Sequence, residues 1–289
     1  MNGALAVARY TVVELTRRRI LLVFAVIGAL GTLGLGVGLK ILYSVAGSVS
    51  LSGQQDPARF QKFLEVAFLS YLYGALGIFA LLIAFAVGMT AIYHDLDSGA
   101  AVSILSKPIT RLAYTAGKIG AAVTTLVVVV GVLAVEARLV MLLFAGGLSS
   151  SLTGEVIAVL ANSVLVMLLV LALSTWMNNI IAATVAFVYY NVITGVVVAV
   201  HTLVHGNGFD NVIVRGLFDV LYWLVPHELV SSAPGDLARA QIELSNSASS
   251  HQALALVPPA SGAGDVVWWA FLIALLCGLC YFAVRRRQV

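Results

Sequence analysis

The chain has 289 residues, of which 61% are hydrophobic and only 10% are charged. A soluble domain carries about 25% charged residues, so this composition excludes an ordinary soluble protein and indicates a membrane protein. The formal net charge of +3 gives no support for a nucleic-acid partner, and none is expected.

Apolar runs long enough to cross a bilayer recur along the chain. A transmembrane helix needs roughly 20 apolar residues. A transmembrane barrel would instead show short strands of alternating polarity, whereas these runs are unbroken. The sequence therefore predicts an all-α, polytopic bundle that forms a single transmembrane domain over residues 1–289. Six spans are predicted, at about 20–44, 67–93, 112–145, 155–175, 180–204 and 266–284.

The distribution of basic residues predicts the orientation of these spans. Lys and Arg favour the cytoplasmic ends of membrane helices. With six spans, both termini share a side with the loops after the second and fourth spans. That side holds ten of the sixteen Lys and Arg residues, so both termini are predicted to be cytoplasmic. The ten are Arg9, Arg17, Arg18, Arg19, Lys107, Arg111, Lys118, Arg285, Arg286 and Arg287.

The N-terminal region contains an amphipathic helix and a stripe of small residues. Residues 4–16 place Leu5, Ala8, Val12 and Leu15 on one helical face and precede an Arg triplet, which predicts a helix in the inner membrane interface. In the first span, small residues at spacings of three, three and four allow close approach of another helix. This packing joins either two subunits of a dimer or two helices of one subunit. The stripe is Gly28, Gly31, Gly34 and Gly38.

The fifth span carries polar side chains near its middle. Asn191 follows Tyr190, and a free amide at this depth is costly unless it bonds another helix or faces a polar cavity. Tyr190 and Asn191 are therefore the candidate residues of a transport path.

An outer segment of about sixty residues, 205–264, separates the fifth and sixth spans. The stretch from Asp210 to Pro226 has one apolar face and is too short to span the membrane, which predicts a helix along the outer leaflet. A second short helix is expected near Leu237 to Leu244.

Residue types with metal or redox chemistry give only weak signals. His201 and His205 share one helical face, but no third ligand is evident, so an interfacial pair is expected and no metal site is predicted. Cys277 and Cys280 lie inside the last span, where two small apolar side chains are the expected role. No catalytic constellation is visible, so neither an enzyme nor a cofactor is predicted.

The largest cytoplasmic loop, residues 94–111, is followed by a Gly-Lys pair, Gly117-Lys118. A phosphate-binding loop needs Gly five residues before that pair and Ser or Thr after it. Leu112 and Ile119 occupy those positions, so the chain has no such nucleotide site.

The order of residues in this region resembles the coupling loop of ABC type-2 exporter permeases. That loop has an acidic residue, a Ser-Gly or Gly-Thr pair, an apolar helix, a Pro followed by an Arg, and a Gly-Lys pair that opens the third span. The chain departs from it by having Asp where the family more often has Glu. Residues 4–16 also resemble the family's elbow helix. The matching residues are Asp95, Asp97, Ser98, Gly99, Ile104, Leu105, Pro108, Arg111, Gly117 and Lys118.

The resemblance implies a permease in the inner membrane of a prokaryote. It would pair with a second permease copy and bind two copies of a separate ATPase through residues 94–111, with Ile104 and Leu105 as the apolar anchor. The layout is similar to permeases of lipid and drug exporters and to the permease that serves nitrous oxide reductase maturation. Spans with so little charge favour a lipid-like or amphipathic cargo over a small ion.

Other functions stay open. The long outer segment suits a membrane component that transmits ATPase motion to an outer accessory protein. An ATP-independent transporter or channel would need polar residues along a midplane route, which these spans nearly lack. A membrane enzyme would need a polar constellation at one depth.

Overall fold

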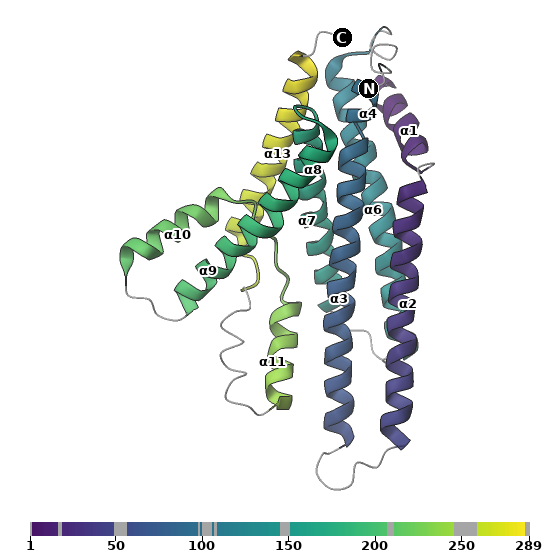
Figure 1. The fold of residues 1–289 in the computed structure, drawn as a ribbon, viewed down its shortest axis with the longest axis vertical. Helices are drawn as coiled ribbons and strands as arrows, with labels where there is room; N and C mark the ends of the chain where they lie inside the picture. Colours follow the sequence, from purple (N-terminus) through teal and green to yellow (C-terminus); the bar gives the residue numbers. More distant parts are fainter. Residues whose placement is uncertain are drawn as a thin grey trace.

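The computed structural model describes residues 2–16, 19–48, 57–97, 99, 106, 109–144, 151–206, 211–245 and 259–286. Within these ranges the chain forms helices and no β-strand, which confirms the predicted all-α fold. The elements are α1 (Asn2–Thr16), α2 (Arg19–Ser48), α3 (Pro57–Thr90), α4 (Tyr93–Asp97), α6 (Arg111–Phe144), α7 (Ser151–Ser174), α8 (Asn179–Phe187), η1 (Val188–Thr194), α9 (Gly195–Gly206), α10 (Val212–Leu224), α11 (Ala233–Ser245) and α13 (Ala263–Arg286). Figure 1 shows an elongated bundle in which α1, α4 and the carboxyl end of α13 lie at one end.

The described residues include five helical stretches that are long and apolar enough to cross a membrane. They are Phe68–Asp95, Arg111–Val140, Thr153–Ser174, Asn179–His205 and Ala263–Arg286. These stretches coincide with the predicted second to sixth spans, so the multi-pass helical fold is confirmed. The predicted first span lies in α2, whose apolar stretch Val26–Gly38 is shorter than the other five. A total of six spans therefore stays a prediction.

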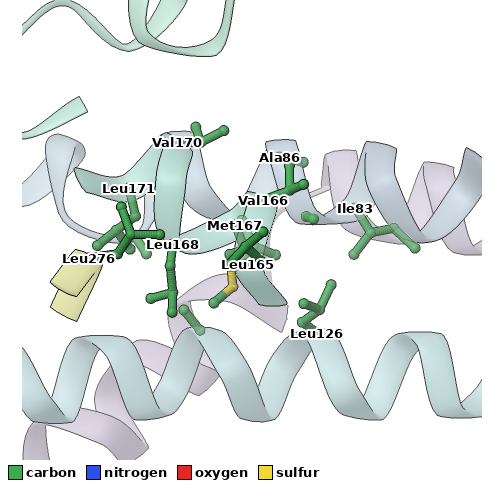
Figure 2. Packing of buried hydrophobic residues seen from close by; sticks show 14 of the residues in the cluster. Ile83, Ala86, Leu126, Leu165, Val166, Met167, Leu168, Val170, Leu171 and Leu276 are labelled. Carbon is green, nitrogen blue, oxygen red and sulfur yellow. The ribbon is translucent and has the colours of Figure 1, made fainter. Parts of the chain in front are cut away.

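The hydrophobic core lies where α7 packs against α3 and α6. Figure 2 shows Leu165 and Met167 of α7 beside Ile83 of α3 and Leu126 of α6, and all four side chains are fully buried. A β-carbon added at Gly88 on α3 would lie 2.7 Å from the Met167 carbonyl oxygen. The absence of a side chain at Gly88 therefore allows α3 and α7 to approach closely.

Buried hydroxyl groups in these helices bond to their own backbone. Thr125 Oγ1 donates to the Ala121 carbonyl at 2.9 Å, and Ser163 Oγ donates to the Val159 carbonyl at 2.7 Å. Because hydrocarbon offers no water as a partner, such bonds let polar side chains reside in spans without a cost in unsatisfied donors.

The amphipathic helix α1 packs on α6 through a face that shares Leu15, but not Leu5, with the predicted apolar face. Val7, Thr11 and Leu15 are buried, whereas Leu5 is 74% exposed. A β-carbon at Gly117 on α6 would lie 2.6 Å from the Ala4 carbonyl oxygen. The difference arises because α1 has a protein neighbour, so the face set by helix contact takes precedence over the most apolar face.

The glycine stripe of α2 divides into two halves. A β-carbon at Gly28 would lie 3.1 Å from Leu133, and one at Gly31 would lie 3.5 Å from Phe79, so these glycines pack within the chain. Among the described residues, nothing lies within 4 Å of a β-carbon added at Gly34 or Gly38. Packing within one subunit thus accounts for the first two glycines, and a dimer contact at the other two stays a prediction.

Two antiparallel helical hairpins, α7–α8 and α9–α10, shape the second half of the chain. α7 and α8 are joined by a tight turn, and the Asn178 side chain caps α8 by accepting from the Ile180 backbone N–H. α9 and α10 lie side by side and extend away from the bundle, while α11 lies along α3 (Figure 1). The predicted outer helices are thus present as α10 and α11, and α11 begins earlier than expected, at Ala233.

Candidate functional site

A buried ion pair joins three helices at the end of the bundle that holds α1 and α4. Lys118 Nζ on α6 lies 2.7 Å from Asp95 Oδ2 on α4 and 3.5 Å from Glu14 Oε2 on α1. The Tyr114 hydroxyl donates a 3.1 Å hydrogen bond to Asp95 Oδ2. Lys118 has no solvent exposure, and Asp95 has 3%. Since a buried charge that loses its partner is strongly destabilising, these contacts hold α1, α4 and α6 together.

The structure describes only part of the loop predicted to contact an ATPase. Gly99 has a φ of 73°, a conformation that favours glycine. Arg111 begins α6, and its guanidinium donates a 2.6 Å hydrogen bond to the Arg285 carbonyl near the end of α13. Asp97 is the last residue of α4. The other predicted contact residues, Ser98, Ile104, Leu105 and Pro108, lie outside the described residues.

Asp95 is the residue of this loop whose place is best defined. It is bonded inside the chain to Lys118 and Tyr114, which anchors the beginning of the loop to α6. Contact between the loop and an ATPase stays a prediction. Lys118 is one of the basic residues predicted to lie on the cytoplasmic side, but the sequence did not predict its burial. Its acidic partners could not be identified because they come from two other helices.

The apolar helical stretch Asn179–His205 changes its winding at η1, a π-helix between α8 and α9. Thr194 Oγ1 donates to the Tyr189 carbonyl, five residues earlier, at 3.0 Å. Asn191 Nδ2 donates to the Phe187 carbonyl of the same helix at 3.3 Å. Segments of π-helix are frequent at functional sites because they widen the helix and redirect its side chains. Both residues proposed for a transport path, Tyr190 and Asn191, lie in η1.

A cavity of about 270 Å³ lies beside η1, and Tyr190 and Asn191 both line it. The rest of its wall comes from α9, α10, the segment after α10 and the start of α13. Its polar side chains include His201, Tyr222, His227, Glu228, Ser261 and Asp265. The predicted polar environment of Asn191 is therefore present as a cavity that combines ionisable and aromatic groups.

A second cavity, of about 160 Å³, lies on the other side of Tyr190 and Glu228. Both residues, with Val230, line the two cavities. On the side of the second cavity, Asn162 on α7 pairs with the Leu229 backbone: Nδ2 donates to the carbonyl at 2.9 Å, and Oδ1 accepts from the N–H at 2.8 Å. These two hydrogen bonds fix the segment that carries Glu228 against α7.

Glu228 lies in a setting that favours its protonated form. The residue is open to both cavities, yet neighbouring protein atoms displace water from its carboxyl group. This desolvation raises the pKa of Glu228; the neighbouring Tyr190 hydroxyl lowers it by less, and the negative charge of Glu155 raises it. Glu228 is thus an acid placed between two cavities that holds its proton more tightly than usual.

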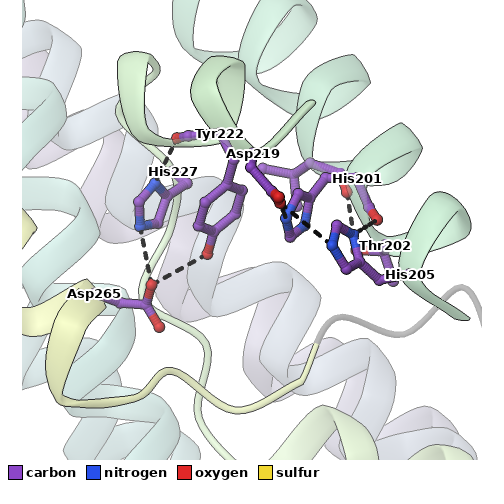
Figure 3. A network of polar contacts seen from close by, with 8 residues as sticks. His201, Thr202, His205, Asp219, Tyr222, His227 and Asp265 are labelled. Atoms are coloured by element: carbon purple, nitrogen blue, oxygen red, sulfur yellow. Dashed lines mark hydrogen bonds and ion pairs between the residues drawn. The ribbon is translucent and has the colours of Figure 1, made fainter. Parts of the chain in front are cut away.

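Histidine, tyrosine and aspartate side chains form a network at the base of the α9–α10 hairpin (Figure 3). His227 Nε2 lies 3.3 Å from Asp265 Oδ1, which also accepts a 3.3 Å hydrogen bond from the Tyr222 hydroxyl. The Tyr222 ring is stacked between the His227 ring, at 4.0 Å, and the His201 ring, at 4.4 Å. Burial, followed by the charge of Asp265, raises the pKa of Tyr222, so its hydroxyl stays protonated and acts as a donor.

The structure gives the predicted histidine pair a partner that the sequence did not reveal. His201 Nε2 is 3.1 Å and His205 Nε2 is 3.3 Å from Asp219 Oδ1 on α10. The pair was expected to be interfacial because no third ligand was evident nearby in sequence. Asp219 becomes that third group only because α10 folds back along α9. Its position on the polar face of an amphipathic helix was the one available signal.

Comparisons with known proteins add no assignment. The chain matches no protein-family model, and a search among curated proteins finds no match.

Proposed function

We propose that this chain is the permease subunit of an ATP-binding-cassette exporter of the type-2 family. Two copies of a separate ATPase subunit supply the energy, and a second permease copy completes the transmembrane pathway. Both termini face the cytoplasm of a prokaryotic cell, and the chain resides in its inner membrane. This proposal rests on the coupling-loop pattern of residues 94–111 and on the way the ends of that loop join the bundle.

The observation that carries the proposal is the buried contact between Asp95 and Lys118. A loop that transmits motion must be attached stiffly to the helices that it moves. Asp95 anchors the beginning of the loop to α6, and Arg111 at its end bonds the last turn of α13. Glu14 extends the same cluster to α1. A displacement of the loop would therefore move α1, α4, α6 and α13 together.

The cavities around η1 supply a route for cargo in this proposal. Tyr190 lies between them and is 2% exposed, so movement of its ring or of the segment that carries Glu228 would connect the two spaces. The walls combine apolar span residues with ionisable side chains. Such a lining suits an amphipathic molecule, whose polar part needs hydrogen bonds and whose apolar part needs a dry surface.

A purified complex tests the proposal directly. The chain is expressed with the ATPase encoded next to it, extracted in a mild detergent, and its mass is measured. We expect two permease chains with two ATPase chains, and ATP hydrolysis that depends on an intact ATPase site. A chain that remains monomeric, binds no ATPase and moves cargo across vesicles without ATP would instead establish an ATP-independent transporter.

One observation favours a second candidate function. The α9–α10 hairpin extends away from the bundle, and α10 has no buried residue along its length. A membrane component that passes ATPase motion to an outer accessory protein would need such a projecting element. ATP hydrolysis that persists without any transported molecule, and that depends on the presence of an outer protein, would favour this candidate over an exporter.

A further inference from the structure

Three side chains at the α9–α10 hairpin place metal-ligating atoms close together. His201 and His205 are one turn apart on α9, and Asp219 faces them from α10 (Figure 3). Their donor atoms all lie within 4.8 Å of one another. Two of the three separations, each from an imidazole Nε2 to Asp219 Oδ1, are 3.1 and 3.3 Å.

These separations agree with the edges of a metal coordination shell. Zn²⁺ binds imidazole nitrogen and carboxylate oxygen at about 2.0–2.2 Å in tetrahedral geometry, which places neighbouring donors roughly 3.3–3.5 Å apart. Two edges are already close to this length. The third separation, between the two imidazole donors, is within 4.8 Å, and the His205 side chain is 42% exposed.

The hydrogen bonds of His205 determine which nitrogen is available. His205 Nδ1 lies 3.0 Å from the His201 carbonyl oxygen. A carbonyl can only accept, so Nδ1 carries the proton, and in the neutral ring the lone pair is on Nε2. That lone pair points to Asp219 Oδ1, another acceptor, at 3.3 Å. Two acceptors in contact require a cation between them, either a proton or a metal ion.

His201 and His205 are each held by further contacts, as metal-binding histidines usually are. A metal-bound histidine typically donates its second nitrogen to a carbonyl or carboxylate, as His205 does. His201 is held by stacking on Tyr222, which in turn bonds Asp265. Two imidazoles and one carboxylate are a donor set that suits zinc and neighbouring first-row metals better than Ca²⁺ or Mg²⁺, which favour oxygen ligands alone.

We propose that His201, His205 and Asp219 form a binding site for a divalent transition metal, with Zn²⁺ as the ion that fits the donors best. The metal joins α9 to α10 beside the 270 Å³ cavity, which His201 also lines. Three protein ligands leave one tetrahedral position for water or for a donor atom of a bound molecule. Metal binding at this site does not require the proposed ATPase subunit.

Metal binding to the full chain in detergent tests this inference. The protein is purified with a tag that contains no histidine, treated with a chelator, and titrated with Zn²⁺ at neutral pH. We expect one Zn²⁺ per chain, with an affinity that falls on the order of 100-fold or more in His205→Ala and Asp219→Asn, since loss of outer contacts alone costs 10–100-fold. His94→Ala is the matched control, because His94 is exposed on α4, outside the α9–α10 hairpin, and it should bind as the unmodified protein does.

Co²⁺ provides a readout of the ligands themselves. Tetrahedral cobalt with nitrogen and oxygen donors gives visible absorption without a thiolate charge-transfer band. Such a band would assign the metal to Cys277 and Cys280 and overturn the inference. Absence of stoichiometric Zn²⁺ binding would also overturn it, as would equal affinity in Asp219→Asn. Asp219→Asn keeps the side-chain shape, and a thermal melt of each metal-free variant verifies that it is folded.

Discussion

Lys118 and Asp95 are 2.7 Å apart in a site where the lysine has no contact with solvent. Glu14 lies 3.5 Å from the same ammonium group, so one cation faces two carboxylates from different helices. The two sides of this contact are consequently unequal. Loss of the lysine removes the cation that both carboxylates face, whereas loss of Asp95 leaves the lysine with Glu14.

Lys118→Met should therefore destabilise the protein more than Asp95→Asn does. Removal of one partner from a buried ion pair costs about 3–5 kcal/mol, and we expect Lys118→Met to fall in this range. Denaturant unfolding in detergent measures both changes in the free energy of unfolding. Equal losses, or a larger loss for Asp95→Asn, would show that Glu14 does not pair with the lysine.

Gly117→Ala should disturb the packing of α1 on α6. The added methyl group would lie 2.6 Å from the Ala4 carbonyl oxygen, so α1 must move. Overpacking of this kind costs about 1–3 kcal/mol. Limited trypsin digestion at the Arg triplet of residues 17–19 measures release of α1 as faster cleavage.

Gly120→Ala is the control for this change. Gly120 lies on the same helix with nothing within 4 Å of an added β-carbon. Replacement of a helical Gly by Ala there should stabilise by roughly 0.5–1 kcal/mol. Similar cleavage rates for the two variants would mean that α1 does not depend on Gly117.

Leu105→Asp should uncouple ATP hydrolysis from transport if residues 94–111 contact an ATPase. A charge in the apolar anchor of an interface removes a contact whose truncation typically costs more than about 1 kcal/mol. The measurements are co-purification of the ATPase and ATP-dependent transport in vesicles. Thr110→Asp is the matched control: it adds the same charge nearby, and Asp can still cap α6 by accepting from the Ala113 N–H, as Thr110 does. If Leu105→Asp keeps the ATPase and full transport, the loop is only a connector.

Glu228 should make the folded state less stable as the pH rises. Its pKa is raised because neighbouring protein atoms desolvate the carboxyl group, so the folded protein retains this proton at pH values where the unfolded chain has lost it. Stability then falls with rising pH, from the ordinary glutamate value of about 4.3 up to the raised pKa, and stays lower above it. Glu228→Gln cannot ionise and should melt higher than the unmodified protein above this window, with little difference near its lower limit. Melting curves across this pH range that keep the two proteins parallel would contradict the assignment.

Tyr190→Phe should widen the pH range over which stability falls, because it should raise the upper limit of that range. The Tyr190 hydroxyl favours ionised Glu228, so its removal raises the pKa of Glu228 further. The pH at which stability stops falling should move upward, while Tyr190→Phe combined with Glu228→Gln should show no such shift. The double variant separates an effect on the carboxyl group from a general loss of packing at Tyr190.

Local patterns predicted the membrane fold because each span is encoded by its own apolar run. The helix predicted before Pro226 depends on neighbouring residues only, and it is present as α10. The buried face of α1 could not be predicted in the same way. Val7 and Thr11 are buried because α6 approaches over Gly117, and nothing in residues 4–16 records that neighbour.

The candidate sites depend still more on distant parts of the chain. Tyr190 and Asn191 could be selected because polar groups stand out in an apolar span. Glu228 could not, since its altered acidity arises from burial and from Glu155, which is far away in the sequence. Asp219 meets His201 and His205 only through the return of α10 along α9.

The π-helix η1 also sets the direction in which everything after it points. A helix with 3.6 residues per turn rotates by about 100° for each residue, so a π-turn acts as a one-residue insertion that the helix has absorbed. If Val188 to Thr194 instead wound as an ordinary α-helix with no residue removed, α9 would turn by about 100° about its axis. His201 and His205 would then face away from α10, so the winding of η1 decides whether these two histidines meet Asp219.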